Sequence, residues 1–470
     1  MARMCAPPID SSIVIHTLRR LPDFQPTMAS LPASTAEHLC VLVHGLWGNP
    51  NHLNYLRDTL QAQHPEDRLH ILAAKSNADG WTYDGVEVGG ERIANEIEQK
   101  IKELEQAGSK IKRISMIGYS LGGLVSRYAI GLLYKNGLFN DIEPVNFTTF
   151  ATPHLGVRTP KRGYGAYIWN NLGSRTLSTS GQQMFMMDQF RDSGRPLLAV
   201  MSDQKSIFIK GLRMFKNKSL YANTINDRSV PYFTANISRT DPFVDLEKID
   251  LNYLPGQDEP VILDPSHPVS PRKPKIQDLT YSQRLSMLSQ GARTNLPFYA
   301  VMFLILPIGV PTFLVNSVYQ SYKSAQRVKL HEAGQAGISL GRYRIPLLEE
   351  AQAVQDRVYE RLTDTDDKDF LPTPPPEPQT PATSSTESLD EEQKLARKQS
   401  RKEDSDFPIL ALEEEQFDMI DSLDSLGIKK YPVHIQKHRH THAAIVVRTK
   451  KAGFEEGEAV VKHWAEKFEV

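Results

Sequence analysis

One pentapeptide constrains the fold of this chain more than any other feature. GYSLG places Ser120 between Gly118 and Gly122, after a run that predicts a strand (112–118) and before one that predicts a helix (121–134). A strand that turns directly into a helix forces tight backbone angles at the turn, so the flanking positions must lack side chains. Short patterns also arise by chance, but this context favours an exposed, nucleophilic Ser120.

The sequence around this turn alternates between strand-like and helix-like segments. Strands are predicted over 39–43, 68–74, 112–118, 145–151 and 219–225, and helices over 89–108 and 121–134. Strands separated by helices imply a largely parallel sheet that is covered on both faces. We therefore expect an α/β fold, with a cap over the sheet at about 155–215.

Composition divides the chain into four expected parts. These are a flexible N-terminus (1–36), the α/β core with its cap (37–242), a long insertion (243–425) and a C-terminal part (426–470) that completes the core with a strand at 442–448 and a helix. Within the insertion, residues 363–407 are rich in Asp, Glu, Pro, Ser and Thr, a composition that cannot bury a core and predicts a disordered linker.

Charge and cysteine content limit the kinds of partner and the cellular compartment that we expect. The net charge of -1 gives no reason to expect a nucleic-acid partner. Cys5 and Cys40 are too few for a disulfide framework, which favours a reducing compartment. The first 35 residues lack an apolar run of the kind found in secretory signals, so we expect the protein to face the cytosol.

A serine hydroxyl becomes a useful nucleophile only when a base takes its proton and an acid orients that base. In folds with this turn, the acid follows a later strand and the histidine comes near the end of the chain. Asp227 lies just past the strand predicted at 219–225 and is favoured as the acid. Asp203 is the competitor, within the expected cap, and Asp227 could instead be a turn or capping residue.

Four clustered histidines compete for the role of base: His434, His438, His440 and His442. His442 is favoured because it immediately precedes the strand predicted at 442–448. A metal site is an alternative, since three of these side chains would share a face of an extended segment, but no Cys or carboxylate stands nearby. A basic surface patch is the other alternative. We expect no metal and no cofactor.

Acyl transfer also needs N–H donors for the oxyanion. The residue after the nucleophile, Leu121, can supply one, and the turn that ends at Leu46 can supply another. His44 is then expected to shape that turn. His154 also falls at a strand end, but it precedes Asp227, and this order argues against it as the base.

Several motifs resemble one known family. They are VLVHGLWGNPNHL, TYDGVEVGGERI, IGYSLGGLVSRYAIGLLY, FTTFATPHLGVR, YANTINDRSVPYFTA and HAAIVVR. Together they resemble the serine esterases of the α/β-hydrolase fold, in particular the fungal lipase group that includes a phospholipase of yeast lipid droplets. Carried over by position, the resemblance implies Ser120 as nucleophile, Asp227 as acid and His442 as base, with a lipid ester as substrate.

The apolar segment 296–318 is long enough to cross a bilayer, but Pro307 and Pro311 interrupt it near its middle. Basic residues flank both ends, which favours both ends on the cytosolic side. We expect a re-entrant hairpin, which suits a membrane or the single phospholipid layer of a lipid droplet. A kinked transmembrane helix and a buried core helix are the alternatives.

These observations favour a lipid ester hydrolase, a phospholipase or an acylglycerol lipase, at the cytosolic face of a membrane, lipid droplet or endoplasmic reticulum. One alternative is a membrane-tethered interaction protein that keeps the fold without turnover. The other is an acyltransferase, which would use the same residues on an alcohol acceptor.

Overall fold

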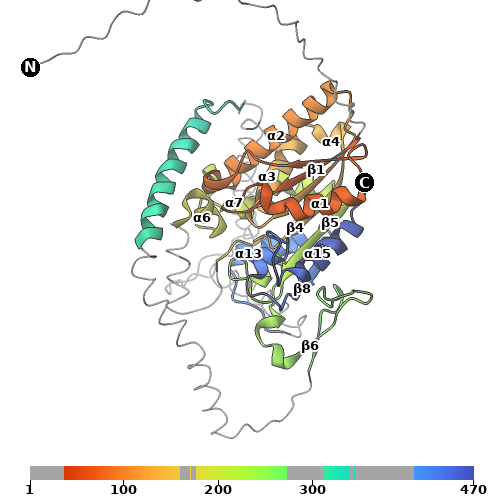
Figure 1. The fold of residues 1–470 in the computed structure, drawn as a ribbon. Coiled ribbons are helices and arrows are strands. Elements are labelled where there is room, and N and C mark those ends of the chain that lie inside the picture. The colour runs from red at the N-terminus through yellow and green to blue at the C-terminus, as the bar shows by residue number, and fades with distance from the viewer. Residues whose placement is uncertain are drawn as a thin grey trace, which may run out of the picture. The chain divides into compact units, whose positions relative to one another are not determined.

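A computed structural model describes residues 36–158, 170, 176–272, 309, 311–338, 343 and 407–470, all within one unit of the chain, Ser34–Val470. Its centre is a six-stranded sheet in the order β2-β1-β3-β4-β5-β8, in which every neighbouring pair is parallel (Figure 1). The strands are β1 (His38–Val43), β2 (Leu69–Ala73), β3 (Arg113–Tyr119), β4 (Glu143–Phe150), β5 (Asn217–Asn223) and β8 (Lys429–Val433). The expected α/β class is confirmed, and the carboxyl ends of all six strands meet at one edge.

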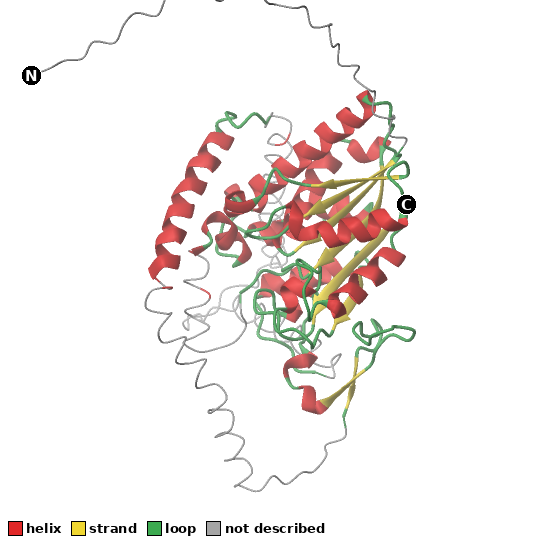
Figure 2. Ribbon diagram, viewed as in Figure 1, coloured by secondary structure: helices red, strands yellow, loops and turns green. Residues whose placement is uncertain are grey.

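Helices cover both faces of this sheet, as Figure 2 shows. On one face, α2 (Val86–Gln106) and α8 (Ile207–Arg213) both pack against α3 (Leu121–Lys135), and on the other α1 (Asn54–Gln63) packs against α15 (Glu455–Glu466). Side chains alternate accordingly along β1, where Leu39, Val41 and Val43 join one apolar cluster and Cys40 and Leu42 join the other. A parallel sheet buried on both faces explains why its strands read as continuous apolar runs.

Helix α2 shows how the pattern specifies an element. Ile93, Ile97, Ile101 and Leu104 recur at helical spacing, and all four are buried in the core. The chain leaves the helix at Gly108, whose φ of 94° lies in the left-handed region that favours glycine.

Apart from the helix at 311–332, which is described below, the remaining elements are short. They are α4 (Leu138–Asp141), α6 (Ser178–Met184), α7 (Leu197–Val200), α9 (Tyr232–Ala235), α13 (Glu414–Asp424), α14 (Thr441–Ala444), an antiparallel pair β6 (Ile249–Leu251) and β7 (Val269–Pro271), and 3-10 turns at Pro50–Leu53, Asp79–Tyr83, Arg191–Ser193, Pro242–Val244 and Leu246–Lys248. Of the cap expected at about 155–215, α8 packs against α3 and so belongs to the helical layer of the core.

The strand expected at 442–448 is wrong. That segment begins in α14 and continues as a turn, and its apolar run is buried because α15 packs directly on it, with Gly457 against the carbonyl of Ala444. The last strand is instead β8. Its sequence, KKYPV, was not predicted as a strand because it contains two lysines and a proline. It lies at the edge of the sheet, where Pro432 is tolerated because an edge strand need not donate from every residue.

Residues 311–332 form a helix whose polarity is reversed relative to an ordinary surface helix. Its inner face is polar: Ser317 donates to the carbonyl of Thr176, Arg327 bonds both oxygens of the buried Asp84, and the buried His331 contacts Glu91. Its exposed apolar side chains are Phe313, Leu314, Val315, Val318, Tyr319, Tyr322 and Leu330.

This helix contains the end of the segment expected to form a hairpin at 296–318. Residues 296–308 and 310 of that segment lie outside the described residues, as do 363–406 of the expected linker and 1–35 of the expected flexible N-terminus. No helix within the described ranges combines the length and apolarity required to span a membrane.

Candidate active site

The nucleophile elbow lies between β3 and α3. Ser120 has φ 55° and ψ -129°, a strained conformation for a residue with a side chain, and its N–H donates to Phe150 O at 2.9 Å. An added Cβ would collide with the Gly123 backbone at Gly118 and with the Val43 carbonyl at Gly122. Both glycines are therefore required by close backbone approach, as predicted.

Three residues predicted from sequence lie together at the carboxyl edge of the sheet. The Nε2 atom of His442 lies 3.0 Å from Ser120 Oγ, and its Nδ1 lies 2.8 Å from Asp227 Oδ2. The histidine comes from α14, and the aspartate from the loop after β5. This chain of hydrogen bonds is the geometry that a serine nucleophile, a base and an orienting acid require.

The loop after β5 holds the Asp227 carboxylate in place. The carboxylate accepts hydrogen bonds from the N–H groups of Ser229 and Val230 and from the side-chain amide of Asn223, at 2.8 to 3.0 Å. Burial alone would raise the pKa of Asp227, but the neighbouring His442 and these donors outweigh it and hold the pKa below its usual value. The acid is therefore kept ionised and aimed at the histidine.

Tyr119 is a site residue that the sequence reasoning missed. Its hydroxyl donates to the carbonyl oxygen of His442 at 2.8 Å, and its ring lies 5.2 Å from the imidazole. On the other side, Thr441 Oγ1 donates to Ile225 O at 3.0 Å. These two bonds attach the histidine segment to the serine turn and to the aspartate loop. The one sequence feature that could have indicated Tyr119 is its position directly before Ser120 in GYSLG.

The loop after β1 lies against the serine. An added Cβ at Gly45 would lie 2.6 Å from Ser120 Cβ, and Leu46 lines the same cavity as Ser120. The N–H of Leu121 begins α3, where first-turn amides have no acceptor within the helix. The role of the Leu46 and Leu121 N–H groups as oxyanion donors stays a prediction. His44 is buried, and its Nδ1 lies 3.1 Å from Gly45 O, consistent with a role in shaping the loop.

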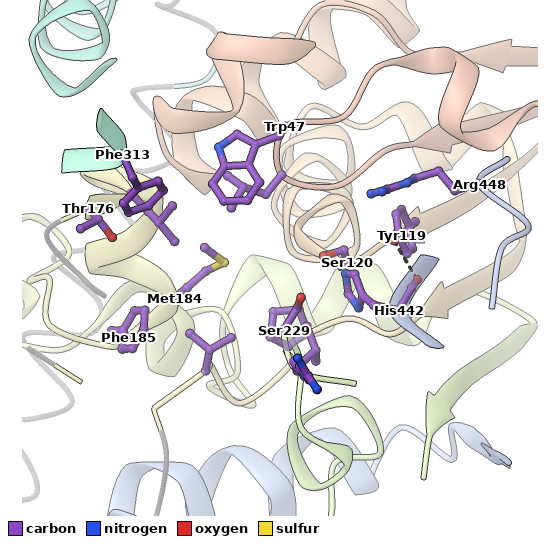
Figure 3. A pocket seen from close by; sticks show the side chains of 16 residues that line it. Trp47, Tyr119, Ser120, Thr176, Met184, Phe185, Ser229, Phe313, His442 and Arg448 are labelled. Atoms are coloured by element: carbon purple, nitrogen blue, oxygen red, sulfur yellow. Dashed lines mark hydrogen bonds between the residues drawn. The ribbon is translucent and has the colours of Figure 1, made fainter. Parts of the chain in front are cut away.

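A cavity of about 550 Å³ opens from the triad (Figure 3). Figure 3 shows Phe313, Thr176 and Phe185 on one side of Ser120 and Arg448 on the other. Its apolar lining comes from Leu46, Trp47, Pro153, Val157, Leu177, Met184, Phe185, Val230 and Phe313. An apolar chain with a reactive group at one end fits such a lining.

The other histidines and the other aspartate considered as base and acid make different contacts. His434 is buried against Thr224 Oγ1 at 2.9 Å, and the rings of His438 and His440 contact each other. His154 is buried with its Nε2 on Thr149 Oγ1, and burial lowers its pKa well below the usual range. Asp203 pairs with Arg195 at 3.1 Å. Among the described residues, no three His, Cys, Asp or Glu side chains are grouped so that they could hold a metal ion.

Comparison with known proteins indicates a family for the part of the chain that carries Ser120 and Asp227. Residues 33–239 match the family model described as "Putative serine esterase (DUF676)". The chain is 33% identical over 240 residues to "Putative lipase ROG1" of Saccharomyces cerevisiae, covering 50% of this chain and 33% of that protein. It is 30% identical over 212 residues to "Putative lipase C4A8.10" of Schizosaccharomyces pombe, covering 43% and 26%. The chain thus spans about a third or less of the length of these curated relatives.

Solved structures of hydrolases show a more distant likeness. The phospholipase PlaB of Legionella pneumophila matches with a TM-score of 0.25 at 16% identity, over 43% of this chain and 41% of that one. A structure described as a putative cell surface hydrolase from Lactobacillus plantarum matches with a TM-score of 0.27 at 13% identity, over 43% and 76%. These scores are too low to carry an argument. The fold is established instead by the parallel sheet and by the turn at Ser120 between β3 and α3.

Proposed function

Because residues 33–239 belong to the serine esterase family, we propose that this chain hydrolyses carboxylic ester bonds of lipids with Ser120, His442 and Asp227. The observation that carries the proposal is the 3.0 Å contact between Ser120 Oγ and His442 Nε2. At that distance the imidazole can take the hydroxyl proton as the oxygen attacks an ester carbonyl.

In the proposed reaction, Ser120 Oγ adds to the ester carbonyl while His442 Nε2 accepts its proton. Asp227 holds the Nδ1–H of the imidazole and stabilises the positive charge that forms there. The N–H groups of Leu46 and Leu121 receive the oxyanion. The protonated histidine then gives its proton to the departing alcohol, and water, activated by the same histidine, releases the acid from the acyl-serine.

The cavity supports a lipid as the substrate. Its apolar lining would bury a fatty acyl chain, while Ser120 and His442 meet the ester at its end. Phospholipids and acylglycerols both present such an ester, and we propose that the chain is a phospholipase or an acylglycerol lipase.

We also propose that it acts at the surface of a membrane or lipid droplet, on the cytosolic side. The support comes from helix 311–332, which turns its polar face inward and its apolar face outward. Val315 and Val318 are 70% and 71% exposed, whereas Phe313 of the same helix lines the cavity. An exposed apolar face this close to the substrate entrance would insert into lipid at little cost. Residues 311–318 of the segment 296–318, which we propose as a hairpin anchor, belong to this helix.

Charges on the same helix favour a phospholipid surface as the partner. Lys323 and Lys329 are exposed, and Tyr319 and Tyr322 offer rings with a polar tip, the kind of side chain enriched at lipid–water boundaries. Cations beside an apolar face are attracted to anionic headgroups.

The catalytic proposal is tested with purified protein and a panel of defined lipids, by measuring released fatty acid. We expect hydrolysis by the natural chain and a loss of at least about a thousandfold in Ser120→Ala, since a triad without its nucleophile retains only weak catalysis. The melting temperature of the variant serves as the folding control. A folded Ser120→Ala protein with near-normal turnover would refute the assignment. A natural chain that binds lipid without turnover would instead favour an interaction protein.

The surface proposal is tested by sedimentation with phosphatidylcholine vesicles containing phosphatidylserine. The double variant Val315→Glu, Val318→Glu should lose about tenfold or more in vesicle binding, because two charges would enter the lipid-facing surface. It should still hydrolyse a soluble short-chain ester. Val244→Glu is the matched control, because Val244 is 78% exposed in the 3-10 turn Pro242–Val244. If both proteins bound vesicles like the natural chain, another part of the molecule would be the docking surface.

A further inference from the structure

Two arginines stand in the wall of the substrate cavity. Among the sixteen described residues that line it, Arg228 and Arg448 are the permanently charged ones, and none of these sixteen is Asp or Glu. The cavity is thus apolar along most of its length and cationic where these two residues lie. A neutral ester with an aliphatic chain has no need of either charge.

Each arginine comes from a loop that carries part of the triad. Arg228 directly follows Asp227, and Arg448 follows the segment that begins at His442. The Arg448 N–H donates to Ala443 O at 3.0 Å, and the preceding Val447 has a φ of 48°, a strained value for a β-branched residue. The backbone that carries Arg448 is therefore fixed relative to the histidine.

Neither guanidinium is neutralised in the part of the chain that the structure describes. Other arginines pair with carboxylates there, as Arg57 does with Asp58 and Arg272 with Asp250, even where both partners are largely exposed. No such pair includes Arg228 or Arg448 in those ranges. Arg448 lies beside the Tyr119 hydroxyl, which is neutral, so its positive charge is not balanced there by a carboxylate. A guanidinium has five N–H donors, and one such neighbour leaves others for an anion.

The arrangement of side chains around Ser120 indicates which half of the ester would carry the anion. Phe313 and Phe185 lie on one side of Ser120, and Arg448 lies on the other, with its guanidinium extending toward the serine (Figure 3). If the acyl chain occupies the apolar side, the alcohol half of the ester must leave the serine on the side of Arg448. A charge on the alcohol half would then meet the guanidinium.

We infer that Arg448 forms a subsite for the phosphate of a glycerophospholipid, and that Arg228 adds a second positive charge to the wall of the same cavity. This inference rests on the proposed function and extends it, because it assigns residues that separate phospholipids from neutral acylglycerols. Arginine binds phosphate through two parallel N–H···O bonds, and the apolar surroundings strengthen that contact.

A matched pair of lipids tests the subsite directly. 1-Palmitoylglycerol and 1-palmitoylglycerol 3-phosphate share the acyl chain and the scissile ester, and differ only in the phosphate. Both are presented in the same uncharged detergent micelles, so that the charge of the surface is constant. The quantity measured is the ratio of kcat/KM for the phosphorylated lipid to kcat/KM for the neutral one.

We expect this ratio to exceed one in the natural chain and to fall about tenfold in Arg448→Gln, the size of a lost charge-assisted hydrogen bond. Arg228→Gln should lower it less, and Arg448→Lys should restore part of it. Arg68→Gln is the control, since Arg68 is exposed and precedes β2, at the edge of the sheet opposite the triad. The ratio should be unchanged in that variant.

The same ratio distinguishes a phosphate-binding role of Arg448 from a purely structural one. Arg448 lies beside the Tyr119 hydroxyl, so its loss could slow both reactions alike by disturbing the histidine. A ratio that stayed constant while both rates fell would overturn the phosphate subsite and leave Arg448 as a structural residue. A ratio below one in the natural chain would overturn it as well. If neither lipid, nor a soluble ester, were hydrolysed, the failure would be that of the proposed function.

Discussion

The Tyr119 hydroxyl donates a 2.8 Å hydrogen bond to the backbone carbonyl of His442, residues separated by 323 positions in the sequence. The side chain that precedes Ser120 thus fixes the backbone of His442. The bond holds the backbone rather than the imidazole itself, so Tyr119 positions the histidine without taking part in proton transfer.

Tyr119→Phe should lower kcat about twofold to tenfold, the value of one net hydrogen bond, and leave KM for a soluble ester nearly constant. Steady-state kinetics over a range of ester concentrations measures both constants. A change confined to KM would mean that Tyr119 contacts the substrate rather than positioning the histidine.

The histidines should separate into three groups. His442→Ala should abolish ester hydrolysis as fully as loss of the serine, because no other described histidine reaches Ser120 Oγ. His438→Ala and His440→Ala should be tolerated. His434→Ala should keep the triad but lower the free energy of unfolding by about 1–3 kcal/mol, because it leaves the buried Thr224 hydroxyl without that partner.

Activity assays and urea unfolding of the four single variants provide this comparison. An inactive His440→Ala protein beside an active His442→Ala protein would contradict the arrangement of α14.

Asp227 should make folding sensitive to acid. Its folded-state pKa lies below the usual 3.8, so its stabilising effect is present above about pH 3.8 and is lost as the pH falls through the lower, folded-state value. The stability difference between the natural chain and Asp227→Asn should therefore shrink as the pH is lowered from about 6 to about 3. Urea unfolding across that range measures it. A difference that grew toward acid pH would show that the folded-state pKa is raised.

Arg327→Gln should loosen helix 311–332. Asp84 is fully buried, and Arg327 bonds both of its carboxylate oxygens, so the substitution leaves part of a buried charge without a partner. We expect a loss of about 1–3 kcal/mol and faster chymotrypsin cleavage at Tyr319 and Tyr322. Arg272→Gln, which breaks an exposed pair with Asp250, should change little. Equal cleavage rates would mean that other contacts hold the helix.

Much of the core could be predicted because local pattern and tertiary burial agree there. The five predicted strands and the helices at α2 and α3 have sequences whose apolar spacing is the spacing of buried positions. Ser120 was found because its turn needs glycine on both sides, and that requirement is visible in the sequence.

The last strand and part of the candidate site could not be predicted, because they depend on contacts between segments far apart in the sequence. The sequence pattern favours His442 because it predicts a strand at 442–448, which the structure lacks. The run AAIVV is apolar because it is buried under α15, and a buried turn resembles a buried strand in sequence. The real strand, β8, carries two lysines and a proline because it lies at the edge. Arg448 belongs to the site only through folding, and no local pattern marks it, whereas the one local signal for Tyr119 is its position within GYSLG.

The position of β8 has a consequence for how this protein is made. The acid and the base are 215 residues apart, with the whole of 273–406 between β7 and α13, and the nucleophile precedes the base by 322. A chain still on the ribosome therefore carries its serine, its oxyanion loop and its aspartate long before it carries a base. Until residues 429–448 emerge and join the sheet, the nascent protein holds a serine that cannot be activated. Late synthesis of this segment would thus delay the proposed activity until the acid and the base are both in place.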